Sequence, residues 1–370
     1  MTSRLSFQSL SVRGFRNISE LTLEPAERLN VLAGDNGQGK TSLLEAVYFL
    51  ATSRSFRAER MGELVQQGQS AAVVRAQVVE QGVPREQRAA ITGGRRSLKL
   101  DDKAPKNLAS YATRTPVVVF HPGDLALGSG PASVRRTLLS RVALYFEPTA
   151  LSHQGRYTRA ARERQRLLDE RGTEARELEV FEILMAESGA LLAATHRRAA
   201  ERLAQAVLPA FRRMAAPDLQ LEVRYQPGGA EDREVFQREL FTRRLRDKSA
   251  RRPSFGPQRD DLELSLDGRS ARRHASQGQL RVLTLALKLA ELTCVREARG
   301  AHPVLLLDDV SSELDPERTG AVYRFVREAA SQVFVTTTRP ELFTTPELEP
   351  DERRDFRLVR GALERTVSPS

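Results

Sequence analysis

The chain has 370 residues, 40% of them hydrophobic, which suits a sizeable core in two or three domains or in one domain with an insertion. A mean hydropathy of −0.43, the lack of a long apolar run and the lack of a signal-peptide pattern argue against a membrane protein, and the single cysteine, Cys294, excludes an intrachain disulfide. The 58 lysines and arginines exceed the 48 aspartates and glutamates, and the net charge of +10 is compatible with a polyanionic partner. We therefore expect a soluble cytoplasmic protein.

Two short apolar runs begin the chain, and they predict a β-hairpin. Their apolar positions are Leu5, Phe7, Val12, Ile18, Leu21 and Leu23. The connection between the runs contains Arg13 and Arg16, close in sequence to the segment that follows.

That segment, residues 29–45, has an apolar run, a glycine-rich stretch and then apolar residues at helical spacing. Gly34, Gly39, Lys40 and Thr41 match the spacing G-x-x-x-x-G-K-[ST]. A strand, a glycine-rich loop and a helix in this order form the context that a phosphate-binding P-loop requires. We therefore predict a nucleotide site here.

Each residue type in the loop has a chemical reason. The glycines let the backbone approach the phosphates, and the N–H groups at the helix start face the anion. Lys40 is expected to reach the β- and γ-phosphates, and the Thr41 hydroxyl to hold Mg²⁺. Arg13 and Arg16 either contact the nucleotide or form a basic turn. The predicted loop ligands of ATP are Gly34, Asp35, Asn36, Gly37, Gln38, Gly39, Lys40, Thr41 and Ser42.

Four further strands are predicted after the P-loop helix, at Ala72–Val79, Ala89–Ile91, Leu98–Leu100 and Val117–Phe120. Arginines and lysines lie on and between the first three. They either contact DNA or form the polar tips that many soluble sheets carry.

From about Ser133 to Leu208 the apolar residues recur at helical spacing, which predicts a helical hairpin resembling a short coiled coil. We expect Pro209 and Pro217 to end it. A strand is expected next, followed by an amphipathic helix. The strand carries Leu219, Leu221, Val223 and Tyr225, and the helix carries Phe236, Leu240, Phe241 and Leu245.

Residues 233–259 form the densest basic stretch of the chain, with nine basic residues against three acidic ones. Such a stretch either contacts phosphates or is a solvated face, and the neighbouring motifs favour phosphate contact.

The last third of the chain again has an α/β pattern. Alternating leucines at 262, 264 and 266 predict a strand, and further strands are predicted at Val304–Leu307, Val333–Val335 and Phe356–Val359. Asp308 ends a continuous apolar strand, as in a Walker B motif, so we predict that it holds Mg²⁺ opposite Thr41. Asp309 is then expected to position the attacking water, which makes Asp309 and Lys40 the predicted catalytic residues.

Two more motifs resemble loops of a known class of ATPase. Ser276-Gln277-Gly278-Gln279 resembles the signature loop of ABC-type ATPases, and Ser312-Glu313-Leu314-Asp315 resembles their D-loop. A P-loop and a Walker B strand separated by a helical insertion are the layout of SMC-type ATPases. Residues 256–262 and 307–315 are similar to the RecF family, and the resemblance covers nearly the whole chain.

The resemblance implies an ATP-dependent homodimer in which Ser276, Gly278 and Gln279 of one chain contact the ATP of the other. It also implies binding to single-stranded, gapped or junction DNA, and cooperation with RecR and RecO in loading RecA. Asp309 stands in place of a catalytic glutamate, and Thr337 or Thr338 in place of a switch histidine. No glutamine directly follows the strand that ends at Phe120, where such ATPases carry one. These departures predict a weak ATPase.

We therefore expect an α/β fold, an ABC/SMC-type ATPase head with a mixed sheet interrupted by a short helical insertion. The predicted segments are 1–130 with the P-loop, 131–250 as the helical arm, and 251–370 with the signature, Walker B and D-loop. The main alternative is the nucleotide-binding subunit of an ABC transporter, which does not explain the charged insertion. A small-molecule kinase is a third possibility, but it needs no signature loop.

Overall fold

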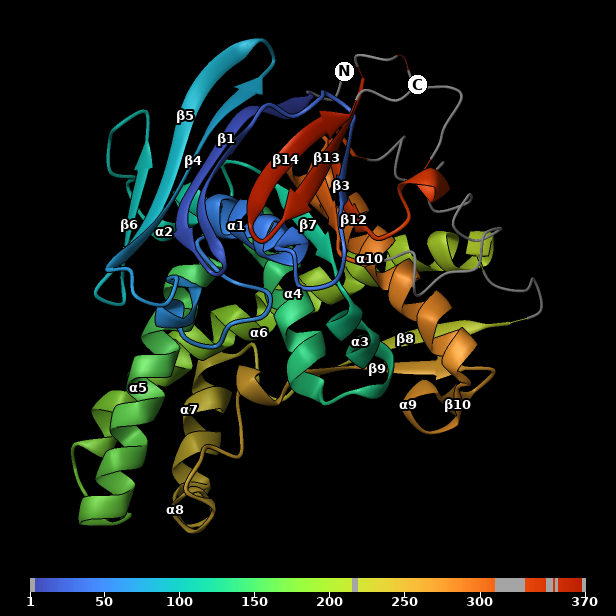
Figure 1. Ribbon diagram of the computed structural model, residues 1–370. Helices are drawn as coiled ribbons and strands as arrows, with labels where there is room; N and C mark the ends of the chain where they lie inside the picture. Colours follow the sequence, from blue (N-terminus) through green and yellow to red (C-terminus); the bar gives the residue numbers. More distant parts are fainter. Residues whose placement is uncertain (1–3, 215–218, 310–329, 344–348, 350–351, 368–370) are drawn as a thin grey trace. The chain divides into compact units, whose positions relative to one another are not determined.

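The computed structural model describes residues 4–214, 219–309, 330–343, 349 and 352–367 (Figure 1). The chain forms two compact units, one of Met1–Asp124 with Val295–Ser370 and one of Leu125–Cys294. The second unit keeps residues 251–294 together with the helical segment because strands on either side of residue 250 pair with each other. The three-segment division of the sequence stays a prediction.

An antiparallel five-stranded sheet forms one layer of the first unit. The predicted hairpin is confirmed, and the first three strands predicted after the P-loop helix are longer than the apolar runs suggested. In order the strands are β2 (Ile18–Leu23), β1 (Leu5–Phe15), β4 (Ala71–Glu80), β5 (Val83–Thr92) and β6 (Arg95–Leu100).

A mixed six-stranded sheet forms the second layer. Its order is β14 (Ala362–Val367), β13 (Arg353–Val359), β3 (Leu29–Ala33), β12 (Val333–Thr337), β11 (Val304–Leu307) and β7 (Val117–Phe120). All neighbours are parallel except β13 and β14. Strands β7 and β11 are continuous apolar runs, β12 begins as one, and all three are buried, as expected for a sheet covered on both faces. The carboxyl ends of β3, β11 and β12 therefore meet at one edge.

Helix α1 (Lys40–Thr52) lies between the two sheets and contacts strands of both (Figure 1). It is buried almost all around, which explains why its sequence from Leu43 to Ala51 is apolar apart from Glu45. One core cluster joins α1 to both sheets. A short α-helix, α2 (Leu108–Ala112), and two 3-10 helices, η1 (Met61–Leu64) and η2 (Pro122–Leu125), also belong to this part of the chain.

Helices dominate the second unit. They are α3 (Ala126–Ser129), α4 (Ala132–Phe146), α5 (Ala150–Arg171), α6 (Leu178–Met214), α7 (Arg233–Thr242), α8 (Arg244–Ala250), α9 (Ala271–His274) and α10 (Gln277–Arg299), which continues into the first unit. The predicted helical hairpin is confirmed, because α5 packs along α6. The small antiparallel sheet has β10 (Arg269–Ser270), β9 (Asp261–Leu266) and β8 (Leu221–Gln226) in that order.

The prediction that Pro209 ends the helical segment is wrong, because α6 continues through it to Met214. A proline inside a helix removes one hydrogen bond and costs about 3 kcal/mol. Buried Val207, Ala210 and Phe211 on either side supply packing that offsets this cost. Pro217 lies outside the described residues.

The prediction of a single amphipathic helix around Phe236 is also wrong. The helix breaks at Arg243 into α7 and α8. Phe236 and Leu240 are buried, whereas Phe241 and Leu245 are 61% and 71% exposed. Apolar residues at helical spacing do not show where a helix breaks. The sequence therefore did not reveal that Phe241 and Leu245, unlike Phe236 and Leu240, are exposed.

Candidate nucleotide-binding site

The P-loop joins β3 to α1, as predicted. Gly34, Gly37 and Gly39 have φ values of 150°, 81° and 104°, which L-residues rarely adopt. A Cβ on Gly34 would also lie 2.5 Å from the carbonyl oxygen of Leu358. Glycine is therefore required at this position both by its backbone conformation and by the strand packed beside it.

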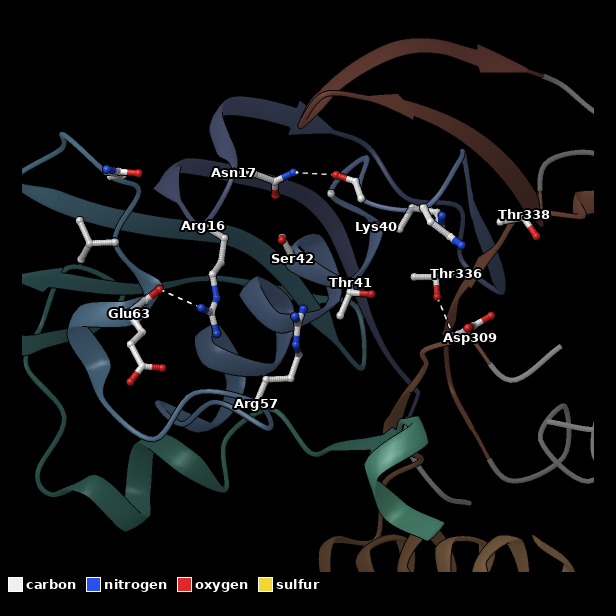
Figure 2. Close-up of a pocket in the computed structure, with 15 residues that line it drawn as sticks. Arg16, Asn17, Lys40, Thr41, Ser42, Arg57, Glu63, Asp309, Thr336 and Thr338 are labelled. Carbon is white, nitrogen blue, oxygen red and sulfur yellow. Dashed lines mark hydrogen bonds between the residues drawn. The ribbon is translucent and has the colours of Figure 1, made fainter. Parts of the chain in front are cut away.

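Lys40 is held at the start of α1 and points back over the loop (Figure 2). Its Nζ donates to the carbonyl oxygens of Gly34 at 2.5 Å and Asp35 at 2.8 Å. Burial lowers the pKa of Lys40, and the nearby charges of Asp309 and Asp308 oppose this effect. The ammonium group therefore lies where phosphate oxygens can replace carbonyl oxygens as its partners.

Thr41, Asp308 and Thr336 meet at the carboxyl edge of the mixed sheet. The Thr41 and Thr336 hydroxyls donate to Oδ1 of Asp308 at 2.8 and 2.9 Å. Burial raises the pKa of Asp308, while these two hydrogen bonds oppose the shift. The Walker B carboxylate is thus brought to the P-loop threonine, as the sequence predicted.

Asp309 follows at the mouth of the site. Its N–H donates to the Thr336 hydroxyl at 2.9 Å, and its φ is 52°. Its carboxylate lines the pocket in Figure 2. Thr336 therefore fixes the positions of both aspartates.

The pocket has a volume of about 610 Å³, and its described lining comes from the first unit alone. Six of the nine predicted loop ligands line it, whereas Gly34, Asp35 and Gln38 do not and instead hydrogen-bond neighbouring protein groups. Gln38, for example, accepts from the N–H groups of Arg360 and Gly361. The lining residues are Arg16, Asn17, Asn36, Gly37, Gly39, Lys40, Thr41, Ser42, Arg57, Glu63, Val65, Gln67, Asp309, Thr336 and Thr338.

The two predicted arginines differ in position. Arg16 lines the pocket and pairs with both carboxylate oxygens of Glu45, at 2.9 and 3.0 Å. Arg13 pairs with Glu20 on the surface, and its side chain is 67% exposed. The turn thus places Arg16 at the pocket, whereas Arg13 is absent from its lining.

Arg57 is a pocket residue that sequence reasoning missed. Its loop is fixed by Ser55, whose Oγ donates to Glu45 and accepts from the Arg57 N–H at 2.9 Å. Glu45 thereby connects Arg16 and the Arg57 loop to α1. The only sequence signal was the arginine-rich run at residues 54–57, which does not reveal this fold-back.

The predicted signature residues belong to the second unit. The Ser276 hydroxyl accepts from the Gln279 N–H at 3.2 Å, and Gln279 Oε1 accepts from the Ser276 N–H at 2.8 Å. This reciprocal cap leaves Ser276 and Gly278 exposed at the start of α10. The predicted D-loop, residues 312–315, lies outside the described residues.

The two positions proposed for the switch residue differ. Thr338 lines the pocket, while Thr337 is buried and accepts from the Arg339 N–H at 2.9 Å. After β7, His121 stacks on Phe56 with ring centroids 5.1 Å apart, in the region where a glutamine was sought.

The oxygen donors of the site fit Mg²⁺. Thr41 and Asp308 provide one hydroxyl and one carboxylate side by side, and Mg²⁺ usually takes its remaining ligands from water and phosphates. Within the described ranges, no group of three or more His, Cys, Asp or Glu side chains is arranged to hold a metal. A divalent ion here would therefore depend on the nucleotide.

Comparisons with known proteins agree with this geometry. Residues 6–348 match the family described as RecF/RecN/SMC N terminal domain. An SMC head domain from Pyrococcus furiosus has the same fold, with a TM-score of 0.54, 15% identity, and coverage of 99% of this chain and 96% of that one. The fold and the site thus define an SMC-type ATPase head, as predicted.

Relatives with higher sequence identity show to which branch of this family the chain belongs. The DNA replication and repair protein RecF of Anaeromyxobacter sp. (strain Fw109-5) is 39% identical, with 98% of each chain covered, and that of Symbiobacterium thermophilum is 38% identical over 96% of this chain and 97% of the relative. A solved structure described as the recombination mediator protein RecF-ATPrS in the RecFOR pathway superposes with a TM-score of 0.87 at 27% identity and 98% coverage of both chains. The chain belongs to the RecF family of DNA replication and repair proteins.

No described helix combines the length and apolar character needed to cross a bilayer.

Proposed function

We propose that this protein is an ATP-gated DNA-binding protein of recombinational repair and replication-fork recovery. The observation that carries the proposal is the 2.8 Å contact between Thr41 and Asp308, which joins two distant parts of the sequence at the nucleotide pocket. A P-loop ATPase needs this pairing to hold a metal–nucleotide complex. The relatives solved as RecF-ATP and RecF-ATPrS support ATP as the nucleotide.

In this proposal, the residues of the pocket have separate roles. Lys40 exchanges its two loop carbonyls for phosphate oxygens, and the N–H groups at the start of α1 bind the same anion. Mg²⁺, when bound, would neutralise phosphate charge. Asp309 orients the attacking water, but its side chain is one methylene shorter than glutamate. We therefore expect slow hydrolysis, so that ATP acts as a timed clamp.

The exposed start of α10 supports an ATP-dependent homodimer. Free N–H groups at a helix N-terminus suit an anion, and Ser276 and Gly278 are exposed there. We propose that this loop binds the γ-phosphate held by the partner chain, so that two ATP molecules join an isologous dimer. Loss of the γ-phosphate then opens the dimer.

In the cell, the proposed dimer closes on single-stranded, gapped or junction DNA. The net charge of +10 suits this ligand, and the relatives are described as DNA replication and repair proteins. We further propose that it works with RecO and RecR in RecA loading and SOS induction, and that it is cytoplasmic and associated with the nucleoid. The nearly full-length similarity to RecF proteins argues against a transporter subunit or a small-molecule kinase.

Analytical ultracentrifugation tests the proposal. The wild type should sediment as a monomer with ADP and as a dimer with ATP, and ATP plus DNA should give the dimer on DNA. Lys40→Ala should lose nucleotide binding, whereas Ser276→Arg should bind ATP but stay monomeric. If ATP leaves the wild type monomeric, or if both variants dimerise normally, the clamp is wrong.

A further inference from the structure

A second pocket lies in the second unit, and its walls come from α3, α4, α9 and the small sheet of β8, β9 and β10. It has a volume of about 550 Å³, which is in the range of pockets that bind small molecules. The two pockets share no described lining residue, so this one is separate from the ATP site.

One wall carries two arginines that are unpaired among the described residues. Arg272 and Arg273 follow each other on α9, are exposed, and both line the pocket. Within the part of the chain that the structure describes, the side chain of neither forms an ion pair or a hydrogen bond. A guanidinium group donates parallel hydrogen bonds in a geometry that phosphate oxygens match. This wall therefore suits a phosphate group.

The acidic residues of the pocket do not compensate these two arginines. Asp261 accepts two hydrogen bonds from the buried guanidinium of Arg135, at 2.7 and 3.0 Å, so that this pair is neutral. Glu263 accepts from the side-chain amide of Gln226 at 2.8 Å and forms no ion pair within the described ranges. The pocket thus offers a positively charged wall and, apart from it, one carboxylate that can accept hydrogen bonds.

A ligand that matches both features carries an anion and a hydrogen-bond donor. A nucleotide does so, because its phosphate is negatively charged and the edge of its base has N–H groups, from which carboxylates of proteins accept. Inorganic phosphate would satisfy the arginines and leave the carboxylate without a partner. In a duplex the N–H edge is occupied by base pairing, so the matching nucleotide is an unpaired one.

The pocket adjoins the segments that position the signature loop. Helix α9 ends at His274, and Ser276 follows directly after Ala275. On the other side of the pocket, α3 contacts α9 (Figure 1), and a Cβ on Gly128 would lie 2.8 Å from a methyl carbon of Leu280 in α10. A ligand held between these segments would therefore restrain the start of α10.

We propose that this pocket binds one unpaired nucleotide, with its phosphate on Arg272 and Arg273 and the N–H edge of its base on Glu263. The bound nucleotide orders the start of α10 through α9. A single DNA strand and a free nucleotide both present this chemistry. The DNA strand as the source rests on the proposed function, whereas the site itself does not.

Photo-crosslinking in the Lys40→Ala variant locates the site while the ATP site and the clamp are disabled. The probe is a short oligothymidylate that contains a photoreactive thiothymidine, and mass spectrometry maps the adduct. The expected adduct lies on the peptides that contain residues 226, 261–264 or 270–273. No adduct, or adducts on other peptides only, would overturn the proposal.

Fluorescence anisotropy with a labelled oligothymidylate measures the affinity, again in the Lys40→Ala background. Arg272→Gln combined with Arg273→Gln should weaken binding about tenfold or more, because two charge-assisted contacts are lost. The matched control is Arg212→Gln combined with Arg213→Gln, an adjacent exposed pair on α6 outside the pocket. Equal affinities of the two double variants would overturn the proposal, since any loss would then reflect net charge alone.

Thymidine monophosphate as a competitor distinguishes the two sources. Displacement of the oligothymidylate at equal nucleotide concentration identifies a free nucleotide as the ligand, and failure to displace it identifies the DNA strand; both results are read only where the Arg272 and Arg273 variant has lost affinity. Hydrogen exchange of residues 271–280 should slow when the probe binds. Exchange that a saturating probe leaves unchanged would overturn the ordering of α10. Dimerisation of the wild type with ATP tests the proposed clamp separately, so either proposal can fail alone.

Discussion

At the residue scale, a single hydroxyl, that of Thr336, positions two aspartates, so its removal should affect both. It donates to Asp308 and accepts from the Asp309 N–H, both at 2.9 Å. Thr336→Val keeps the shape but removes both hydrogen bonds. Because such supporting bonds around a metal ligand are worth about 10–100-fold in affinity or activity, we expect ATPase activity to fall by about tenfold or more while Mg²⁺-free nucleotide binding persists.

Steady-state ATPase assays and nucleotide titrations separate these effects. Thr113→Val is the matched control, since the Thr113 hydroxyl is also buried and donates to a carbonyl, that of Ala109, but lies outside the pocket. Equal losses in both variants would show that Thr336 has no special positioning role.

The pKa of Asp308 leads to a pH prediction. Burial raises this pKa, so the folded protein holds the proton at a higher pH than an ordinary aspartate with a value near 3.8. A metal needs the deprotonated carboxylate, so the Mg²⁺-dependent part of nucleotide affinity should decrease on acidification, beginning above that ordinary range. For folding the sign is opposite: stability falls as pH rises between the unfolded and the raised folded pKa.

Isothermal titration of nucleotide with and without Mg²⁺ across mildly acidic pH measures this effect. Asp308→Asn should lose both the Mg²⁺ increment and its pH dependence. A constant increment down to the ordinary aspartate range would contradict the assignment of Asp308 to the metal.

At the element scale, an ion pair connects the signature helix α10 to α4. Arg141 donates to both carboxylate oxygens of Glu291, and Lys288 pairs with the same group. Although burial alone would raise the pKa of Glu291, the two cations lower it to about 2, from 4.5. The depressed pKa stabilises the fold above pH 4.5, and this contribution is lost as the pH falls from 4.5 to about 2.

Glu291→Gln should therefore lower the free energy of unfolding at neutral pH, because removing one partner of a buried ion pair typically costs about 3–5 kcal/mol. Denaturant melts at several pH values test this, and the gap between variant and wild type should narrow below pH 4.5. If the difference in free energy of unfolding between variant and wild type does not depend on pH, the loss of stability comes from packing and not from the ion pair.

A second buried ion pair holds the helical arm together. Arg164 is fully buried and donates to Glu182 at 3.0 Å, Asp247 at 2.8 Å and the Leu240 carbonyl at 2.6 Å. Arg164→Met leaves buried carboxylates without this cation, which typically costs about 3–5 kcal/mol. In thermal unfolding, the melting temperature should decrease strongly for Arg164→Met. It should hardly change for Arg166→Met, whose side chain is 60% exposed. Similar melting temperatures for both would mean that the arm does not need the ion pair.

At the scale of the whole molecule, the proposed dimer predicts complementation between inactive variants. Lys40→Ala lacks a functional P-loop but has an intact signature loop, and Ser276→Arg has the opposite defect. Mixed with ATP, they should form a heterodimer with one working composite site, since each chain supplies what the other lacks. ATPase activity of the mixture, compared with each variant alone and with either variant plus buffer, measures this. A mixture as inactive as its components would argue against a signature loop acting in trans.

Much of this fold was determined by sequence patterns of short range. The spacing of Gly34, Gly39, Lys40 and Thr41 between an apolar run and a helical pattern located the loop, because glycine conformations and a helix start are local requirements. Strands β7, β11 and β12 were predicted from their apolar runs, whereas β13 was predicted only in part, as Phe356–Val359, and β14 was not predicted. The position of Asp308 was predicted because it directly follows one of these runs, Val304–Leu307.

Only the tertiary structure decided which distant residues complete the pocket and which apolar residues stay exposed. Thr336 reaches both aspartates because β12 pairs between β3 and β11, and Arg57 reaches the pocket because Ser55 bonds Glu45. Phe241 and Leu245 have the same apolar character as buried Phe236 and Leu240, but Phe241 lies on the exposed last turn of α7 and Leu245 lies on α8, beyond the break at Arg243. Strand order and helix breaks depend on packing between distant segments, which local periodicity does not encode.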